Sequence, residues 1–118
     1  MSDEINGQAR RVRIYFGESD HHHGRSLWSA FLELLRTEGA SGATVFRGVA
    51  GYGAHSRIHT ASIVDLSADL PLVLEWVDTP ERVEQLLPRL TEMLDGGLVT
   101  VELVEITAYR PHRQKPSR

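Results

Sequence analysis

Residues 71–94, PLVLEWVDTPERVEQLLPRLTEML, combine a strand pattern with a helix start and decide the fold. Across residues 72–77 the side chains alternate between two faces, with apolar residues at every second position, as in a strand. Thr79 can cap the free amides of a helix that begins at Pro80, where a missing N–H costs nothing. The leucines that follow recur at helical spacing, and Pro88 among them is expected to kink the helix or to remove one hydrogen bond. The stretch therefore predicts a strand joined directly to a helix.

The same two patterns recur on both sides of this stretch. Residues 11–16 alternate as a strand, and Leu27 begins a helical repeat that Gly39 ends. Residues 43–50 and 99–106 are rich in residue types that favour strands. The order of elements predicts an α+β ferredoxin-like sandwich (βαββαβ), a four-stranded antiparallel sheet with both helices on one face. The other face of the sheet then lacks a cover, which self-association would provide.

Length and composition are those of a single globular domain. The 118 residues are 41% hydrophobic and 25% charged, which fits one domain over residues 11–108. We expect residues 1–10 and the basic tail of residues 109–118 to be disordered. The net charge of -3 argues against nucleic acid as a partner, and there is no cysteine for a disulfide or a thiol nucleophile. Neither a leader peptide nor a membrane-spanning run is encoded, so the cytoplasm is the expected compartment.

A glycine-rich stretch, residues 48–53, follows the second predicted strand. Neither a Lys-Ser/Thr pair nor a helix comes after it, which excludes a P-loop and a dinucleotide-binding fingerprint. The glycines would still let backbone amides approach a ligand closely, and His55, Arg57 and His59 are suitable donors to an anion such as phosphate. A tight turn whose Arg and His side chains pair with neighbouring carboxylates or water explains the same residues. The residues alone leave both interpretations open.

Three consecutive histidines, residues 21–23, follow Glu18 and Asp20. Imidazoles and carboxylates are suitable ligands for zinc, copper or nickel, and His21 and His23 are the candidate ligands here. Consecutive residues of one chain cannot all converge on one ion, and no second pair of ligands completes a tetrahedron. A solvated loop with incidental histidines is the simpler explanation.

Catalytic motifs are weak in this chain. Ser19, Asp20 and His21 contain the groups of a nucleophilic triad, but adjacent residues point in different directions and cannot form the relay. No HExxH motif is present, and no paired carboxylates stand at the ends of the predicted strands. We therefore expect no enzymatic activity. A hydrolase or transferase at a subunit cleft would have to use a histidine as its general base.

Six short motifs together resemble one family. They are RIYFGESD at residues 13–20, GATV at 42–45, RG at 47–48, GYG at 51–53, SRIHT at 56–60 and DLP at 69–71. In combination they are similar to domain of unknown function 190, a bacterial and archaeal family, across residues 11–107. That family is PII-like, so the resemblance implies the ferredoxin-like fold of the trimeric PII nitrogen regulators and of the CutA proteins.

The resemblance also implies a ligand site. PII proteins hold adenine nucleotides between subunits, at the base of a long loop after the second strand, and Gly51-Tyr52-Gly53 is similar to the Gly-Phe-Gly at that base. The glutamine that follows in PII proteins is replaced by His55, and residues 95–98 lack their phosphate-binding lysine, so Arg57 and His59 would supply the cations. The ligand-binding residues implied in this way are Gly51, Tyr52, Gly53, His55, Arg57, His59 and Thr60.

These inferences combine into one expected function. The chain is expected to be a cytoplasmic homotrimer without enzymatic activity that binds a small anionic metabolite, an adenine nucleotide such as ATP, ADP or AMP. Occupancy would be relayed through residues 51–60 to a protein partner, a membrane transporter or another regulated protein. The alternative is a CutA-like trimer that binds a divalent metal ion, with His21 and His23 of several chains around its rim.

Overall fold

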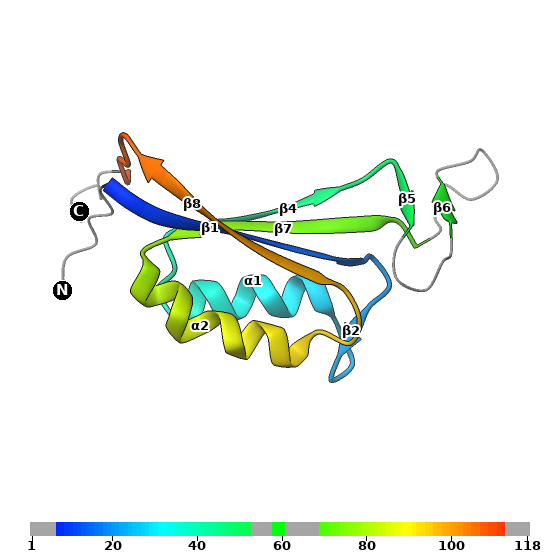
Figure 1. Cartoon of the computed structure of the whole chain (residues 1–118). Helices are drawn as coiled ribbons and strands as arrows, with labels where there is room; N and C mark the ends of the chain where they lie inside the picture. Colours follow the sequence, from blue (N-terminus) through cyan, green and yellow to red (C-terminus); the bar gives the residue numbers. More distant parts are fainter. Residues whose placement is uncertain (1–6, 53–57, 61–68, 113–118) are drawn as a thin grey trace, which may run out of the picture.

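The computed structural model describes residues 7–52, 58–60 and 69–112. Its elements are β1 (Gly7–Gly17), β2 (His21–His22), β3 (Arg25–Ser26), α1 (Leu27–Thr37), β4 (Ala43–Arg47), β5 (Ala50–Tyr52), β6 (Ile58–Thr60), β7 (Pro71–Asp78), α2 (Pro80–Met93) and β8 (Leu98–Ile106). Four strands form an antiparallel sheet in the order β4-β7-β1-β8, and both helices lie on one face of it (Figure 1). Two further pairs of strands, β2-β3 and β5-β6, form small hairpins. The architecture is the expected ferredoxin-like α+β sandwich.

β7 and α2 form where the sequence pattern of residues 71–94 predicts a strand and a helix. Burial alternates along the whole of β7, and Trp76 is among its buried residues. The hydroxyl of Thr79 accepts a hydrogen bond from the amide of Arg82 at 3.1 Å and so caps α2. Pro88 lies inside α2 without ending it, since the helix continues to Met93.

The core lies between the sheet and the two helices. Phe16 and Phe31 meet edge to face within it, with their ring centroids 5.2 Å apart. The buried residues of this cluster are Val12, Ile14, Phe16, Leu27, Phe31, Leu35, Leu72, Leu74, Trp76, Val83, Leu86 and Leu90. All of them belong to β1, α1, β7 and α2, so the edge strands β4 and β8 contribute only partly buried side chains to the core. Neither helix of the described residues is long and apolar enough to cross a membrane.

The first strand is longer than its sequence pattern predicts. β1 begins at Gly7, so the expectation that residues 1–10 are disordered is wrong for the last four of them. Gly7 pairs with Ile106 and Arg10 pairs with Leu103. The partner strand β8, and not an alternating pattern in β1 itself, holds this segment in the sheet.

Two loops also differ from the expectations. The polar loop after β1 contains the β2-β3 hairpin, and the second predicted strand is interrupted after Arg47 before β5 begins at Ala50. In the tail, the phenol of Tyr109 donates a hydrogen bond to the carbonyl oxygen of Ser41 at 3.3 Å. Tyr109 thus contacts the loop before β4, and the expected disorder of residues 109–118 stays a prediction. The last six residues lie outside the described part of the chain.

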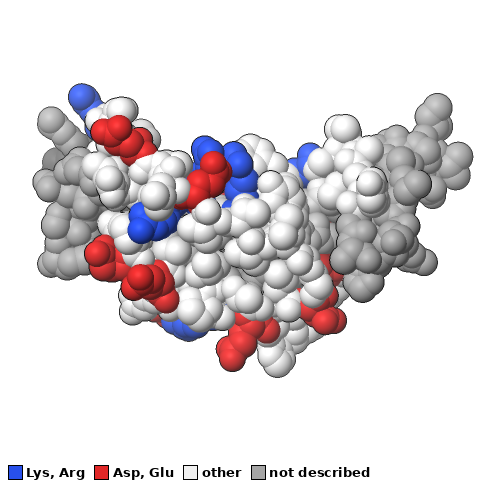
Figure 2. Space-filling view, viewed as in Figure 1, with Lys and Arg blue, Asp and Glu red and all other residues white. Residues whose placement is uncertain are grey.

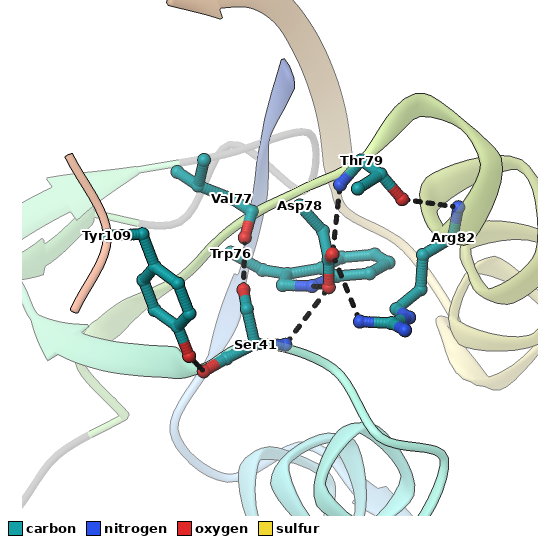
Figure 3. Close-up of polar contacts among 7 residues, drawn as sticks. All are labelled: Ser41, Trp76, Val77, Asp78, Thr79, Arg82 and Tyr109. Carbon is teal, nitrogen blue, oxygen red and sulfur yellow. Dashed lines mark hydrogen bonds and ion pairs between the residues drawn. The ribbon is translucent and has the colours of Figure 1, made fainter. Parts of the chain in front are cut away.

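A buried carboxylate joins three parts of the fold (Figure 3). Asp78, at the end of β7, is fully buried and accepts hydrogen bonds from the indole of Trp76 at 2.9 Å and the amide of Ser41 at 3.0 Å. It also accepts one from the amide of Thr79 at 2.9 Å, and the guanidinium of Arg82 lies 3.4 Å away. Ser41 precedes β4, whereas Thr79 and Arg82 lie at the start of α2. Asp78 therefore fixes the α1–β4 loop against the start of α2.

The face of the sheet opposite the helices, which we call the open face, carries an apolar row. Paired residues on neighbouring strands point to the same side of a sheet. The register aligns four apolar residues across all four strands, Phe46, Val73, Tyr15 and Leu98. Three of the four are exposed, and no described helix or strand covers this row, while Ala108 and Tyr109 approach Val77 elsewhere on the face (Figure 1).

Beside the apolar row, the open face carries a network of ion pairs. Arg13 lies between two carboxylates, 3.0 Å from Glu75 and 3.2 Å from Glu102, and Arg11 lies 2.8 Å from Glu102. The hydrogen bond to Glu75 is the main cause that raises the pKa of Arg13. The two guanidinium groups and two carboxylates neutralise each other, so this network of ion pairs adds no net charge to the open face.

Candidate functional site

Four elements of the sheet meet at the end from which the β5-β6 hairpin projects (Figure 1). β1 and β4 end there, and β7 and β8 begin there, as shown by the pairing of Gly17 with Pro71 and of Arg47 with Leu72. The glycine-rich stretch after β4 is thus placed beside the start of β7. We call this end of the sheet the hairpin base.

The glycines of the hairpin base pack against one proline ring. The amide of Gly48 donates a hydrogen bond to the carbonyl oxygen of Pro71 at 2.7 Å. A Cβ atom on Gly48 would lie 3.0 Å from Cγ of Pro71, and one on Gly51 would lie 3.1 Å from it. Side chains at these two positions would require the proline ring or the hairpin to shift by a few tenths of an ångström. The glycines therefore set the path by which the chain leaves the sheet.

The hairpin brings part of the predicted ligand site together. Gly51 pairs with His59, and their neighbours in β5 and β6 pair in the same antiparallel ladder, Ala50 with Thr60 and Tyr52 with Ile58. The side chain of Tyr52 is 77% exposed. The predicted residues Gly53, His55 and Arg57 lie outside the described residues. Two strands of the hairpin are thus established, and the roles of its predicted cations stay a prediction.

Carboxylates hold the loops of the hairpin base together. Asp69 accepts a hydrogen bond from the amide of Ser19 at 2.7 Å, and Asp20 accepts one from the amide of Gly17 at 3.1 Å. Glu18 forms an ion pair with the guanidinium of Arg47. Arg47 therefore reaches this base already paired, and an anionic ligand there would depend on backbone amides and on cations from elsewhere.

Asp69 and Gly17 were not singled out by the sequence argument as site residues. A Cβ atom on Gly17 would lie 2.9 and 3.0 Å from the two carboxylate oxygens of Asp69. The available signal was their position inside the quoted motifs, with Gly17 in RIYFGESD and Asp69 in DLP. Spacing along the chain does not show that the two motifs touch.

Replacing Gly17 with alanine tests this contact. We expect Gly17→Ala to lower the free energy of unfolding by about 1–3 kcal/mol. The added methyl group would push the carboxylate of Asp69 away from the amide of Ser19, from which it accepts a hydrogen bond. Urea denaturation measures the change. Gly42→Ala is the matched control, since a Cβ atom there meets nothing within 4 Å. Equal stability of the two variants would contradict the account of the hairpin base.

A small cavity opens next to the hairpin base, between α1 and the edge strand β4. Its volume is about 370 Å³, and it is lined by Glu18, Trp28, Leu32, Val45, Arg47 and Leu72. Trp28 on α1 is 40% exposed. An aromatic ring and an ion pair thus border one apolar hollow beside the glycine-rich exit.

The loop before β8 approaches the same end of the sheet. Gly97 has φ of 153°, and a Cβ atom on it would lie 2.4 Å from the carbonyl oxygen of Tyr15. The next residue, Leu98, pairs with Tyr15. Only a glycine lets the chain pass this close to β1 before it enters β8.

The histidine cluster lies in the β2-β3 hairpin. His21 pairs with Ser26, and the rings of His22 and His23 meet edge to face with centroids 4.1 Å apart. His23 has φ of 51°, in the left-handed region that forms the turn. Across residues 7–52, 58–60 and 69–112, no three His, Asp or Glu side chains are grouped so that they could hold a metal ion. A metal site that uses His21 and His23 would need ligands from further chains and stays a prediction.

The β2-β3 hairpin is attached to α1 by a guanidinium. Arg25 forms an ion pair with Glu33, and it donates a hydrogen bond to the hydroxyl of Ser29 at 2.9 Å. The hydrogen bond from Arg25 lowers the pKa of the Glu33 carboxyl below its usual value. These contacts give Arg25 a structural role in the hairpin.

Comparisons with known proteins agree on the family and the fold. The model of the family DUF190, described as "Uncharacterized ACR, COG1993", matches residues 9–106. UPF0166 protein MJ1524 of Methanocaldococcus jannaschii is 35% identical over 95 residues, which cover 80% of this chain and 87% of that protein. A UPF0166 protein of Aquifex aeolicus is 34% identical over 95 residues, covering 80% and 90%.

Among solved structures, the fold is similar to that of CPII from Thiomonas intermedia, which was determined bound to ADP and bicarbonate. The TM-score is 0.54 and the sequence identity is 18%, with 86% of this chain and 90% of that chain covered. At this identity the likeness concerns the fold.

Proposed function

The chain belongs to the DUF190 family, and from that premise we propose that it is a PII-like regulatory protein that binds a small anionic ligand, an adenine nucleotide, between copies of itself. The likeness of its fold to CPII supports the proposal, because CPII carries the fold and was solved with ADP. The chain is proposed to act in the cytoplasm and to work by binding, without catalysing a reaction.

One observation carries the proposal, namely the exit of the chain from β4 at the hairpin base. Gly48 and Gly51 lie against Pro71 without side chains of their own, so the chain leaves the sheet in a tight exit in which the amide of Gly48 donates to Pro71 and the following backbone is proposed to meet the ligand. Backbone amides in such turns bind anions well. Since Glu18 already pairs with Arg47, the proposal assigns the cations to His55, Arg57 and His59.

The open face supports self-association. Its apolar row crosses all four strands and is uncovered in the single chain. An exposed aromatic and aliphatic patch of this kind marks an interaction surface. A closed ring of identical subunits would cover it, and the proposed number of three follows from the resemblance to PII proteins. The clefts between subunits would then lie beside the hairpin base of each chain.

Isothermal titration with ATP, ADP and AMP tests the ligand. The full chain is expected to bind at least one of the three in a saturable titration. The absence of any binding heat at millimolar nucleotide would overturn the proposal.

Replacing Arg57 with alanine tests the proposed cation. We expect Arg57→Ala to weaken nucleotide binding by about 1–3 kcal/mol, or about 5- to 150-fold, because a charge-assisted hydrogen bond to a phosphate is lost. The same titration measures it. The control is Arg36→Ala, which removes an exposed arginine from α1. An affinity for Arg57→Ala that equals the control would remove Arg57 from the site.

The proposed output is a change in the hairpin region. Nucleotide at the hairpin base would alter how residues 51–60 are presented to a protein partner, which we propose to be a membrane transporter or another regulated protein. A nucleotide-dependent change in the affinity for such a partner would be the functional signal.

A further inference from the structure

A trough runs between α2 and the side of β8 that faces the helices. α2 packs under β1, and β8 extends beyond it as the edge of the sheet. The trough encloses about 670 Å³ and is lined by Arg10, Pro80, Val83, Glu84, Leu87, Pro88, Thr91, Glu92 and Val101. Val101 is 46% exposed, and its neighbour on the same side of β8, Leu103, is 72% exposed. Figure 2 shows an uncharged surface over the middle of this front of the molecule, with acidic and basic side chains at its left and acidic ones along its lower edge.

Arg10 brings a positive charge to this trough, whose lining also carries the carboxylates of Glu84 and Glu92 on α2. It follows from the register that Arg10 points to the helix side of the sheet, because it pairs with Leu103 and lies two residues before the buried Val12. Its guanidinium donates a hydrogen bond to the carbonyl oxygen of Ala9 at 3.4 Å. Within the described part of the chain it forms no ion pair, in contrast to Arg11 and Arg13 on the open face.

Two backbone features add hydrogen-bonding capacity beside the trough. β8 is nine residues long and pairs only with β1 among the described strands, so its outer edge presents unpaired amide and carbonyl groups. On α2, Pro88 has no N–H to donate to the carbonyl oxygen of Glu84. An apolar floor, a cation and a free strand edge thus occur together.

We propose that this trough is a docking site for an extended peptide segment of a protein partner, which adds to β8 as a fifth strand. Its backbone would pair with the free edge, and alternate side chains would enter the trough, as in β-strand addition. The residue opposite Leu103 would carry a carboxylate that meets Arg10, and the residue opposite Val101 would be apolar. Within the basic tail of this chain, residues 110–118 include neither acidic nor large apolar residues, so this segment does not fit.

The site is separate from the proposed ligand site and does not depend on it. Val101 and Leu103 lie on the helix side of β8, whereas the apolar row of the open face lies on the opposite side. Self-association through the open face would therefore not fill the trough. Nucleotide titration of the variants described below separates the two proposals, because the heat of nucleotide binding should not depend on whether a peptide can dock.

Fluorescence anisotropy with defined probe peptides tests the docking. The probes are fluorescein-labelled, with the sequence Asp-Thr-Val-Thr-Val-Thr in both chain directions, and a second pair has Lys in place of Asp. An Asp probe is expected to bind the full chain saturably. Methylation of its edge-facing amides should abolish binding, because those amides would pair with β8.

Two variants probe the two halves of the site. Arg10→Glu is expected to weaken binding of the Asp probe by about tenfold or more and to make the chain prefer the Lys probe, since specificity here is set by charge. Leu103→Glu should weaken the binding of both probes. Arg36→Glu, a charge reversal on α1, is the matched control and should change neither.

Three results would overturn the proposal. The first is the absence of saturable binding by either Asp probe at millimolar concentration. The second is an Arg10→Glu variant that binds like Arg36→Glu. The third is a change in the molar mass of Leu103→Glu by light scattering, which would show that a second copy of the chain occupies the trough.

Discussion

Replacing Asp78 with alanine is expected to lower the free energy of unfolding by about 3–5 kcal/mol, because the variant leaves three donors at a fully buried position without their acceptor and removes the ion pair with Arg82. The donors are the indole of Trp76 and the amides of Ser41 and Thr79, at 2.9–3.0 Å from the carboxylate. Asp78 is fully buried, which makes the loss of its acceptor oxygens costly. Urea denaturation followed by tryptophan fluorescence measures the loss.

Asp95→Ala is the matched control for this prediction. Asp95 is exposed after the end of α2, so its removal should change the free energy of unfolding by no more than about 0.5 kcal/mol. Asp78→Asn keeps one acceptor oxygen and should fall between the two. A variant Asp78→Ala as stable as Asp95→Ala would show that this carboxylate does not hold the α1–β4 loop to α2.

The second large effect is expected at Gly97. A methyl group there would lie 2.4 Å from the carbonyl oxygen of Tyr15, and φ of 153° is rarely adopted by residues with a side chain. The obstacle is backbone, which cannot rotate away as a side chain can. We expect Gly97→Ala to cost about 3–5 kcal/mol of the free energy of unfolding and to separate the start of β8 from β1.

Hydrogen exchange provides a local measurement for Gly97→Ala. The amides of Tyr15 and Leu98, which pair across β1 and β8, should lose protection more than amides near the other end of β8. Gly42→Ala is again the control, because it has open space and no positive φ. Equal protection in both variants would mean that the close passage at Gly97 is not needed.

The part of the fold that the sequence predicts is the part in which one strand or helix carries its own pattern. β7 alternates along its whole length, and Thr79 and Pro80 mark the start of α2 without any knowledge of the neighbouring strands. The first residues of β1 carry no such pattern. They are in the sheet because β8 pairs with them, which is a property of the tertiary structure.

In the candidate site, too, the sequence predicts what is local and does not predict the contacts between distant segments. The glycine-rich exit is visible in the sequence because glycines are rare in strands, and the structure shows that these glycines pack against Pro71. The contact of Asp69 with Ser19 joins residues 50 positions apart, and the pairing of Glu18 with Arg47 joins two loops. Spacing cannot predict such contacts, because they depend on how four strand ends are brought to one edge.

The trough beside β8 could not be predicted from the sequence either. The apolar residues Val101 and Leu103 have the pattern expected of a covered strand. That β8 is an edge strand, and that α2 packs under β1 and not under β8, follows only from the order of the sheet. An Arg10 without an acidic partner within the described residues becomes informative only once that geometry is known.

Native mass spectrometry of the full chain titrated with ADP tests the central claim most directly, because one spectrum reports both the number of subunits and the number of bound ligands. The account predicts a trimer that takes up ADP in steps until each subunit carries one molecule. A monomer that shows no ADP adduct at saturating concentration would contradict it.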